Sequence, residues 1–137
     1  VEEVYSLREQ FEAFAIRRVV ERQVDVSELR RHSDAMFEAA ERGDLAALNT
    51  ADEAFHRTLI RLADHQLMLS FWDNLYMRIR QIMALRNSAN RDLRAVARNH
   101  PPIIEAIENR DMIRAISLIS DHTRSASQIT PEELGIA

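Results

Sequence analysis

The sequence predicts an all-α fold, an antiparallel bundle of six to seven helices. Apolar residues recur at steps of three and four along most of the chain, which is the period of an amphipathic helix. Only two glycines and three prolines occur in 137 residues, so there is little material for hairpins or tight turns. No stretch shows the alternation of apolar and polar residues that is typical of a β-strand.

Length and composition restrict the class of protein further. A chain of 137 residues is long enough for one domain with a buried core. It has no cysteine, which excludes disulfides and thiolate metal sites and agrees with a cytoplasmic protein. A net charge of −4 argues against a nucleic-acid-binding surface on this chain. No apolar run approaches the roughly 20 residues that a membrane-spanning helix needs.

The first two helices are predicted within residues 1–43. The first covers about residues 1–22, and because the sequence opens inside it we expect a further module upstream. Its apolar face is predicted at Val4, Leu7, Phe11, Phe14, Ala15 and Val19. The second helix is expected to open at Ser27 as N-cap. It is expected to end at Gly43, since glycine favours the left-handed conformation that follows a helix.

Asp44 is the predicted N-cap of a third helix, over about residues 45–63, which the polar stretch "ADHQ" ends. A fourth helix, rich in aromatic and methionine residues, is expected over residues 67–86. Side chains of these types at helical spacing are typical of a packed core. The stretch "NSANRD" that follows predicts a short interruption.

Two prolines divide the next helical stretch, "LRAVARNHPPIIEAIENRD". Proline is tolerated in the first turn of a helix but disrupts its interior. We therefore expect a break just before Pro101 and a new helix that starts at the prolines. Asp111 is the predicted N-cap of the last helix, and residues 129–137 are expected to form a frayed tail.

Three of the five histidines and one aspartate fall on predicted apolar faces. Asp52 and His56 are four residues apart, which places both side chains on one face of the third helix, about 5–6 Å apart at their Cβ atoms. His100 lies three, four and seven residues before isoleucines. His122 lies three, four and seven residues after apolar residues of the last helix. The four side chains are therefore expected to point inward from three different segments.

Facing helices of a bundle bring such side chains into one central cavity. Three imidazoles and a carboxylate suit a divalent cation, for which we expect Zn²⁺, with Ni²⁺, Mn²⁺ or Fe²⁺ as alternatives. A cation would also offset the large free-energy cost of burying Asp52 without a partner. Two simpler interpretations remain open. Asp52 and His56 can form an ion pair, and a core histidine can be satisfied by a backbone carbonyl.

Arginines near these faces are candidates for binding a ligand. Arg8 lies on the first helix, one position past Leu7, and Arg78 and Arg80 lie on the fourth. Most surface arginines are solvated or paired with acids. One that turns inward beside a metal would bind a carboxylate through two parallel hydrogen bonds.

Three segments resemble the effector domain of GntR-superfamily transcription regulators: "VEEVYSLREQFEAFAIRRVVER", "ADEAFHRTLIRLADHQLMLSFWDNL" and "NHPPIIEAIENRDMIRAISLISDHT". The subtype is the FCD domain, in its metal-binding form. The resemblance covers the chain to about residue 127. Its most specific elements are Asp-x-x-Phe-His, the later His-x-x-Ile-x-x-Ala-Ile and the final histidine.

The resemblance implies a fold, a ligand set and a function. Metal-binding members use an aspartate and three histidines, which correspond here to Asp52, His56, His100 and His122, the set that the apolar faces also select. An arginine on the first helix commonly helps to bind the ligand, which corresponds to Arg8. Members are helical bundles that dimerise, bind small organic acids and follow an N-terminal winged helix-turn-helix domain. Residues 1–128 would be the sensing and dimerisation domain, and the DNA-binding domain is absent from these residues.

Two other functions remain as alternatives. A small helical metalloenzyme would need a general base near the metal, and Glu53, next to Asp52, should point away from it by about 100°. A metal-free sensor of an acyl ligand would instead use its histidines only for packing. We expect a sensor rather than an enzyme. The effector would be a small carboxylate, and DNA would be bound only through the missing domain.

Overall fold

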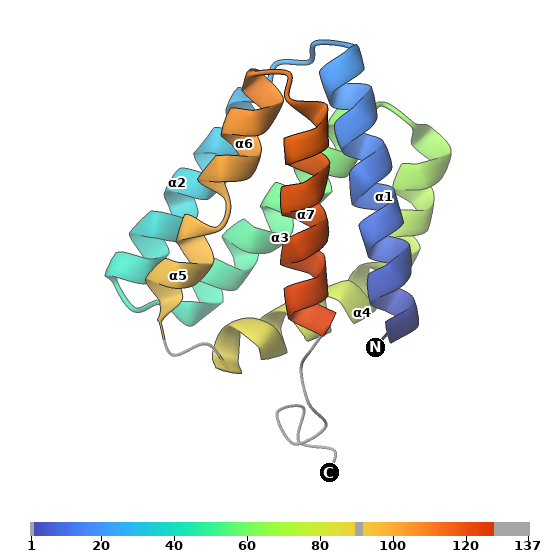
Figure 1. The fold of residues 1–137 in the computed structure, drawn as a ribbon. Coiled ribbons are helices and arrows are strands. Elements are labelled where there is room, and N and C mark those ends of the chain that lie inside the picture. Colours follow the sequence, from blue (N-terminus) through green and yellow to red (C-terminus); the bar gives the residue numbers. More distant parts are fainter. Residues whose placement is uncertain (1, 90–91, 128–137) are drawn as a thin grey trace.

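The computed structural model describes residues 2–89 and 92–127, and all regular structure within them is helical. This confirms the predicted all-α bundle (Figure 1). The predicted tail, residues 129–137, lies outside the described residues. The helices are α1 (Glu2–Glu21), α2 (Ser27–Glu41), α3 (Leu45–Leu62), α4 (Gln66–Ala89), α5 (Leu93–Arg98), α6 (Pro101–Glu108) and α7 (Met112–Ser127).

The helices pack as an up-and-down bundle with α3 at its centre. α1 and α7 lie side by side and antiparallel, and α3 passes behind them (Figure 1). α2 packs along α3, α4 packs against α3 and α1, and α6 lies between α2 and α7. None of the described helices is long and apolar enough to cross a membrane. Side chains of α1, α3 and α7 that point inward therefore share one interior.

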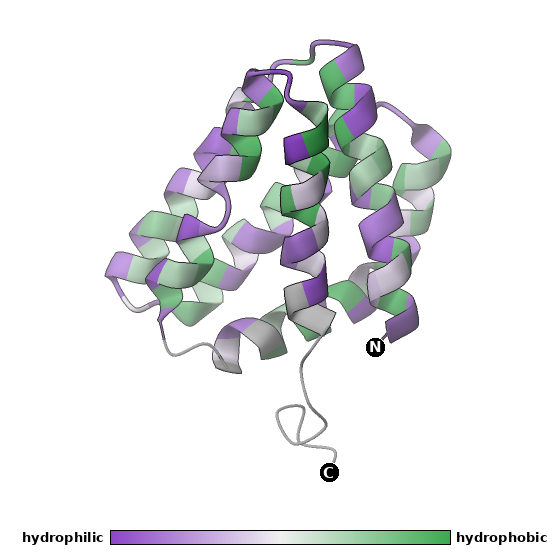
Figure 2. Ribbon diagram, in the orientation of Figure 1, coloured by the Kyte–Doolittle hydropathy of each residue, from purple (hydrophilic) through white to green (hydrophobic). Residues whose placement is uncertain are grey.

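The main core is an apolar cluster to which all seven of these helices contribute, and Tyr5 and Ile82 form a small second cluster. Hydrophobic and hydrophilic residues alternate around the helices, as amphipathic helices require (Figure 2). Each large apolar side chain that is fully buried stabilises the fold by about 1.5–3 kcal/mol relative to an exposed one. Fully or almost fully buried examples are Ile16, Leu29, Met36, Phe55, Leu59, Trp72 and Ile104.

The predicted starts of α3 and α6 are confirmed. Gly43 has φ +66°, the left-handed conformation that an L side chain rarely adopts. Asp44 caps α3, and its Oδ1 accepts a hydrogen bond from the Ala47 N–H at 3.0 Å. α5 ends at Arg98 and α6 begins at Pro101. Because the first N–H groups of a helix have no intrahelical acceptor, prolines at this end lose no hydrogen bond.

The predicted inner face of α1 is confirmed at Ala15 and Val19, which are 0% and 1% exposed, but it is wrong at Leu7 and Phe14. Leu7 and Phe14, expected inside, are 42% and 38% exposed, whereas Arg8 and Glu12 are 1% and 0% exposed. One residue corresponds to a rotation of about 100° around a helix. The prediction followed the apolar residues, and it missed this face because two of its central residues are charged.

Two other boundaries differ from the prediction. Val26, not Ser27, is the N-cap of α2, and the Asp25 side chain accepts the hydrogen bond from the Ser27 N–H at 2.8 Å. α4 continues through Asn87 and Ser88, where an interruption was expected. Asparagine is usually unfavourable in helix interiors because its side chain competes for the hydrogen bonds of nearby backbone groups. The Asn87 side chain is instead engaged by neighbouring side chains of α3.

Candidate metal centre

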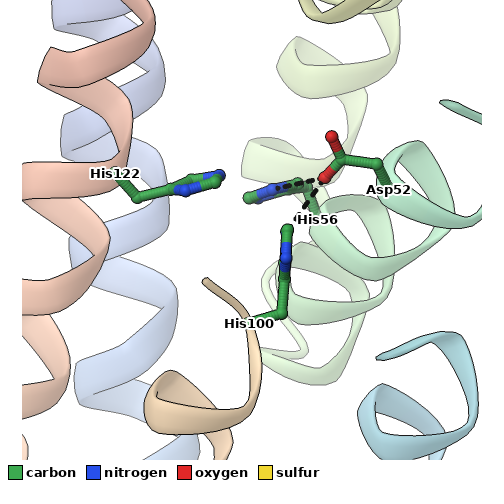
Figure 3. A group of neighbouring side chains, drawn as sticks. All are labelled: Asp52, His56, His100 and His122. Atoms are coloured by element: carbon green, nitrogen blue, oxygen red, sulfur yellow. Dashed lines mark hydrogen bonds and ion pairs between the residues drawn. The ribbon is translucent and has the colours of Figure 1, made fainter. Parts of the chain in front are cut away.

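Asp52, His56, His100 and His122 converge at the centre of the bundle (Figure 3). All four are buried, with none more than 7% exposed. Each offers one ligand atom, and the four atoms lie within 4.8 Å of one another. α3 supplies the first two residues, His100 immediately precedes α6, and His122 lies on α7. The structure thus brings together the four residues that the sequence selected.

The contacts of Nδ1 orient two of the imidazoles. Nδ1 of His100 donates to the Val96 carbonyl oxygen at 2.9 Å. Nδ1 of His56 faces a carboxylate oxygen of Glu12. Both acceptors hold the proton on Nδ1 and turn Nε2 toward the centre. The ring of His122 stacks on that of His56, with ring centroids 5.2 Å apart.

One oxygen of Asp52 contacts the Nε2 atoms of two histidines. Oδ1 lies 3.2 Å from Nε2 of His56 and 3.0 Å from Nε2 of His100. A neutral imidazole has only one N–H, and in each ring Nδ1 holds it. Two Nε2 lone pairs would then face a carboxylate oxygen, which is favourable only if the rings take up a second proton or a cation joins the three atoms. The donor set and its orientation therefore fit a divalent cation.

Two residues of α1 form a second layer around His56. Glu12 accepts a hydrogen bond from Nε of Arg8 at 2.9 Å. Nη2 of Arg8 lies 3.3 Å from both ring nitrogens of His56. Nη1 of Arg8 is buried and has no hydrogen-bond partner among the described residues. A buried guanidinium nitrogen in this state is an open donor for an anion.

Asn87 of α4 supports Asp52 from the other side. Its Nδ2 donates to Asp52 Oδ2 at 3.0 Å and to Asn49 Oδ1 at 2.8 Å. Because Oδ2 is held in this way, Oδ1 is the oxygen that faces the histidines. Oδ1 of Asn87 itself is buried and has no partner among the described residues.

Mutual charges decide the protonation of the centre. Burial alone would raise the pKa of Asp52, but hydrogen bonds with His100 and His56 hold that pKa well below its ordinary value. Burial also opposes the ionisation of Glu12, yet Arg8 and His56 lower its pKa. Burial and the charge of Arg8 lower the pKa of His56, but the Glu12 charge together with hydrogen bonds to Asp52 and Glu12 outweighs them, so that the pKa is raised. Charged groups in this interior therefore stabilise one another.

Other predicted residues lie away from the centre. Arg78 is exposed, and Nε of the exposed Arg80 pairs with Glu53 Oε1 at 3.1 Å. The structure does not bring these two arginines to the buried cluster, and their part in ligand binding stays a prediction. Glu53 points away from Asp52, as expected, and also accepts a hydrogen bond from Tyr76. His32 and His65 are half-buried and contact other groups.

Glu12 and Asn87 are the contacts of the centre that sequence reasoning missed. A signal for Glu12 was present, because it follows Tyr5 and Arg8 and precedes Ile16 and Val19 at steps of three and four. That pattern defines a helical face only if charged residues are counted as buried. No comparable signal marks Asn87, which lies in a stretch with the composition of a loop.

Comparison with known proteins identifies related sequences. The family model of the FCD domain matches residues 3–125. A probable D-xylose utilization operon transcriptional repressor from Paenarthrobacter nicotinovorans is 31% identical over 108 residues, which cover 79% of this chain and 47% of that protein.

Two gluconate operon transcriptional repressors are also similar. The one from Bacillus subtilis (strain 168) is 26% identical over 129 residues, covering 89% of this chain and 52% of that protein. The one from Bacillus licheniformis is 27% identical over 116 residues, covering 80% and 48%. The chain thus spans about half the length of the curated relatives that it matches.

Proposed function

The chain belongs to the FCD domain family of GntR-superfamily transcription regulators, and we propose that it is the effector-sensing domain of such a regulator. In this proposal it binds a small organic acid at a divalent metal ion and thereby controls DNA binding by an N-terminal domain. One observation carries the proposal: a buried Asp and three His lie beside Arg8, whose Nη1 has no partner among the described residues.

The metal would be held by Asp52, His56, His100 and His122. Zn²⁺ is the ion that we expect, and Ni²⁺, Mn²⁺ or Fe²⁺ accept the same donors. When bound, the ion would supply positive charge and an open coordination position for a carboxylate oxygen. The protein contributes the orientation of the ligands, through Val96 and Glu12, and the exclusion of water from a buried site.

Arg8 would bind the carboxylate of the effector. Its Nε is occupied by Glu12, which leaves the buried Nη1 as a donor of known position. A guanidinium paired with a carboxylate forms short, charge-assisted hydrogen bonds. The relatives repress operons for gluconate and D-xylose use, so sugar acids are the first effectors to test.

Regulation would follow from the helix that carries Arg8. α1 also contributes Glu12, and it packs along α7, which carries His122. The DNA-binding domain is proposed to precede α1. An effector that favours one position of α1 over another would change how that domain engages its operator.

A homodimer in the cytoplasm is proposed as the working form. α1 exposes Leu7 and Phe14, and α4 exposes Leu67, Phe71 and Met77, which are large apolar side chains on two neighbouring helices. Sedimentation equilibrium of the wild type and of Phe71→Glu tests this. We expect a dimer that the charged side chain dissociates, and a monomeric wild type would contradict the proposal.

Catalysis is not favoured by the arrangement of acids. The carboxylate next to the cluster, Glu12, is engaged by Arg8, His56 and Thr123. Glu53 pairs with Arg80 outside the centre. Neither is placed to take a proton from a metal-bound group, so we propose a sensor and not an enzyme.

The metal site is tested by equilibrium dialysis against Zn²⁺, with the metal measured by mass spectrometry. We expect wild type to retain one ion per chain, and Asp52→Ala and His122→Ala to lose it. His32→Ala is the matched control, since His32 lies outside the cluster. Retention of the ion by both site variants would refute the assignment.

The effector is tested by a thermal-shift screen of sugar acids and other organic acids, with and without chelator. A ligand that binds only the folded state raises the midpoint of unfolding. Hits should depend on metal and disappear in Arg8→Met. A hit that survives both chelation and the Arg8 substitution would place the effector elsewhere.

A further inference from the structure

One buried carboxylate contacts both halves of the proposed site. Glu12 is 0% exposed and belongs to α1, whereas His56 belongs to α3. Its Oε1 faces Nδ1 of His56, and its Oε2 accepts from Nε of Arg8 at 2.9 Å. Thr123 of α7 places its hydroxyl 3.5 Å from Oε2. A single side chain thus joins an expected metal ligand to the arginine that would bind an anion.

We infer that Glu12 is a positioning residue that prepares His56 for the metal and Arg8 for the carboxylate at the same time. The inference rests on the proposed function of the site. It adds that Glu12 connects the residues that bind the cation to the residue that binds the anion, so that a substitution of Glu12 weakens the binding of both.

On the metal side, Glu12 acts through the imidazole. A carboxylate that accepts the Nδ1–H fixes the ring orientation, keeps Nε2 free and makes it a stronger donor to a metal. Outer contacts of this kind typically change metal affinity about 10–100-fold. His100 receives the equivalent support from a backbone carbonyl, which a side-chain substitution cannot remove. Of these two histidines, His56 is therefore the one whose support can be tested by mutation.

On the anion side, Glu12 acts through the guanidinium. Its carboxylate holds Nε, and the ring of His56 lies against Nη2, so the plane of Arg8 is fixed from two directions. This leaves Nη1 without a partner among the described residues. The negative charge of Glu12 also offsets repulsion between Arg8 and a neighbouring cation, which is strong in a buried site.

The test compares wild type, Glu12→Gln and the control Glu9→Gln, with Co²⁺ as metal probe and acetate as carboxylate probe. Gln keeps the shape of Glu12 but removes its charge, and Glu9 is a half-buried acid of the same helix. Co²⁺ affinity is measured by competition with a chromophoric chelator. The visible absorption of the Co²⁺-saturated protein reports the ligand field, and its change with acetate reports anion binding.

We expect Glu12→Gln to bind Co²⁺ about 10–100-fold more weakly, to show an altered spectrum at saturation, and to lose at least tenfold in acetate affinity. Glu9→Gln should match wild type in all three. If Glu12→Gln loses only thermal stability while its Co²⁺ affinity and saturated spectrum stay as in wild type, the role is structural and the inference fails. If wild type itself binds no Co²⁺, the proposed function fails.

A second measurement needs no variant. Long-range ¹H–¹⁵N NMR correlations of the Zn²⁺-loaded wild type report which nitrogen of each histidine carries the proton. We expect a proton on Nδ1 and the metal on Nε2 of His56. Metal on Nδ1 would overturn the inference even if Glu12→Gln did not fold.

Discussion

At the scale of single residues, the two oxygens of Asp52 have different partners. Oδ1 meets Nε2 of His56 and of His100, and Oδ2 accepts a hydrogen bond from Asn87. A carboxylate held at one oxygen presents the other in a fixed direction, which favours a single-oxygen contact with a cation. Asn87 is therefore expected to matter although it provides no ligand atom.

Replacing Asn87 with Leu should lower Zn²⁺ affinity about tenfold, because outer-layer partners commonly contribute 10–100-fold. The measurement is a competition titration with a chromophoric chelator. Asn74→Leu is the matched control, since Asn74 lies exposed on the same helix. Equal affinities for the two variants would show that the hydrogen bond to Oδ2 does not orient Asp52.

At the scale of helices, α3 determines the geometry of the centre. It carries two of the four expected ligands one turn apart, and its N-terminus is fixed by Gly43 and Asp44. The cap satisfies one of the backbone N–H groups that a helix leaves open at its start. The stability of this end and the alignment of Asp52 with His56 are therefore properties of one element.

Asp44→Ala should lower the free energy of unfolding by about 1 kcal/mol, because a helix loses its N-cap hydrogen bond. Urea denaturation followed by circular dichroism provides the value. Asp34→Ala serves as control, since Asp34 is exposed in the middle of α2. A loss no larger than that of the control would mean that the cap contributes nothing measurable.

The rotation of α1 is open to a similar test. Ile16 is 0% exposed and Leu7 is 42% exposed, although both are apolar residues of the same helix. Ile16→Ala should lower the free energy of unfolding by about 2–5 kcal/mol, the range for large-to-small substitutions in a core. Leu7→Ala should lower the free energy of unfolding by much less. Chemical denaturation of both variants measures the difference. The reverse order would support the face predicted from the sequence.

At the scale of the whole molecule, the centre connects segments far apart in the sequence. α3, the start of α6 and α7 each contribute ligand candidates, and α1 and α4 supply the second layer. An ion bound at this point would hold these elements together, so its binding should be visible in global stability.

Free Zn²⁺ at 100 times its dissociation constant should stabilise the fold by about 2.7 kcal/mol. For a domain of this size that corresponds to a rise of roughly 10 °C in the midpoint of thermal unfolding. A chelator should reverse the rise, and His122→Ala should not show it. Calorimetry of both proteins with and without Zn²⁺ measures the difference, and an equal rise in the variant would locate the ion elsewhere.

The sequence by itself determined the helical class, the start of α3, the break before Pro101 and the four residues that meet at the centre. These follow from local rules, because a period of 3.6 residues and the chemistry of caps depend only on near neighbours. Asp52, His56, His100 and His122 could be selected since each continues an apolar face of its own segment.

Only the tertiary structure decided which face of α1 is inside and which residues support the centre. Glu12 is buried because His56, 44 residues away, donates a hydrogen bond to its carboxylate, and Asn87 stays helical because Asp52, 35 residues away, accepts a hydrogen bond from its side chain. Burial of a polar group is favourable only when other groups satisfy its hydrogen bonds and charge, and both of these side chains have partners on other helices. Asn87 has no local pattern in the sequence, and the pattern around Glu12 is visible only if charged residues are counted as buried, so the ligands were predicted but these two supports were not.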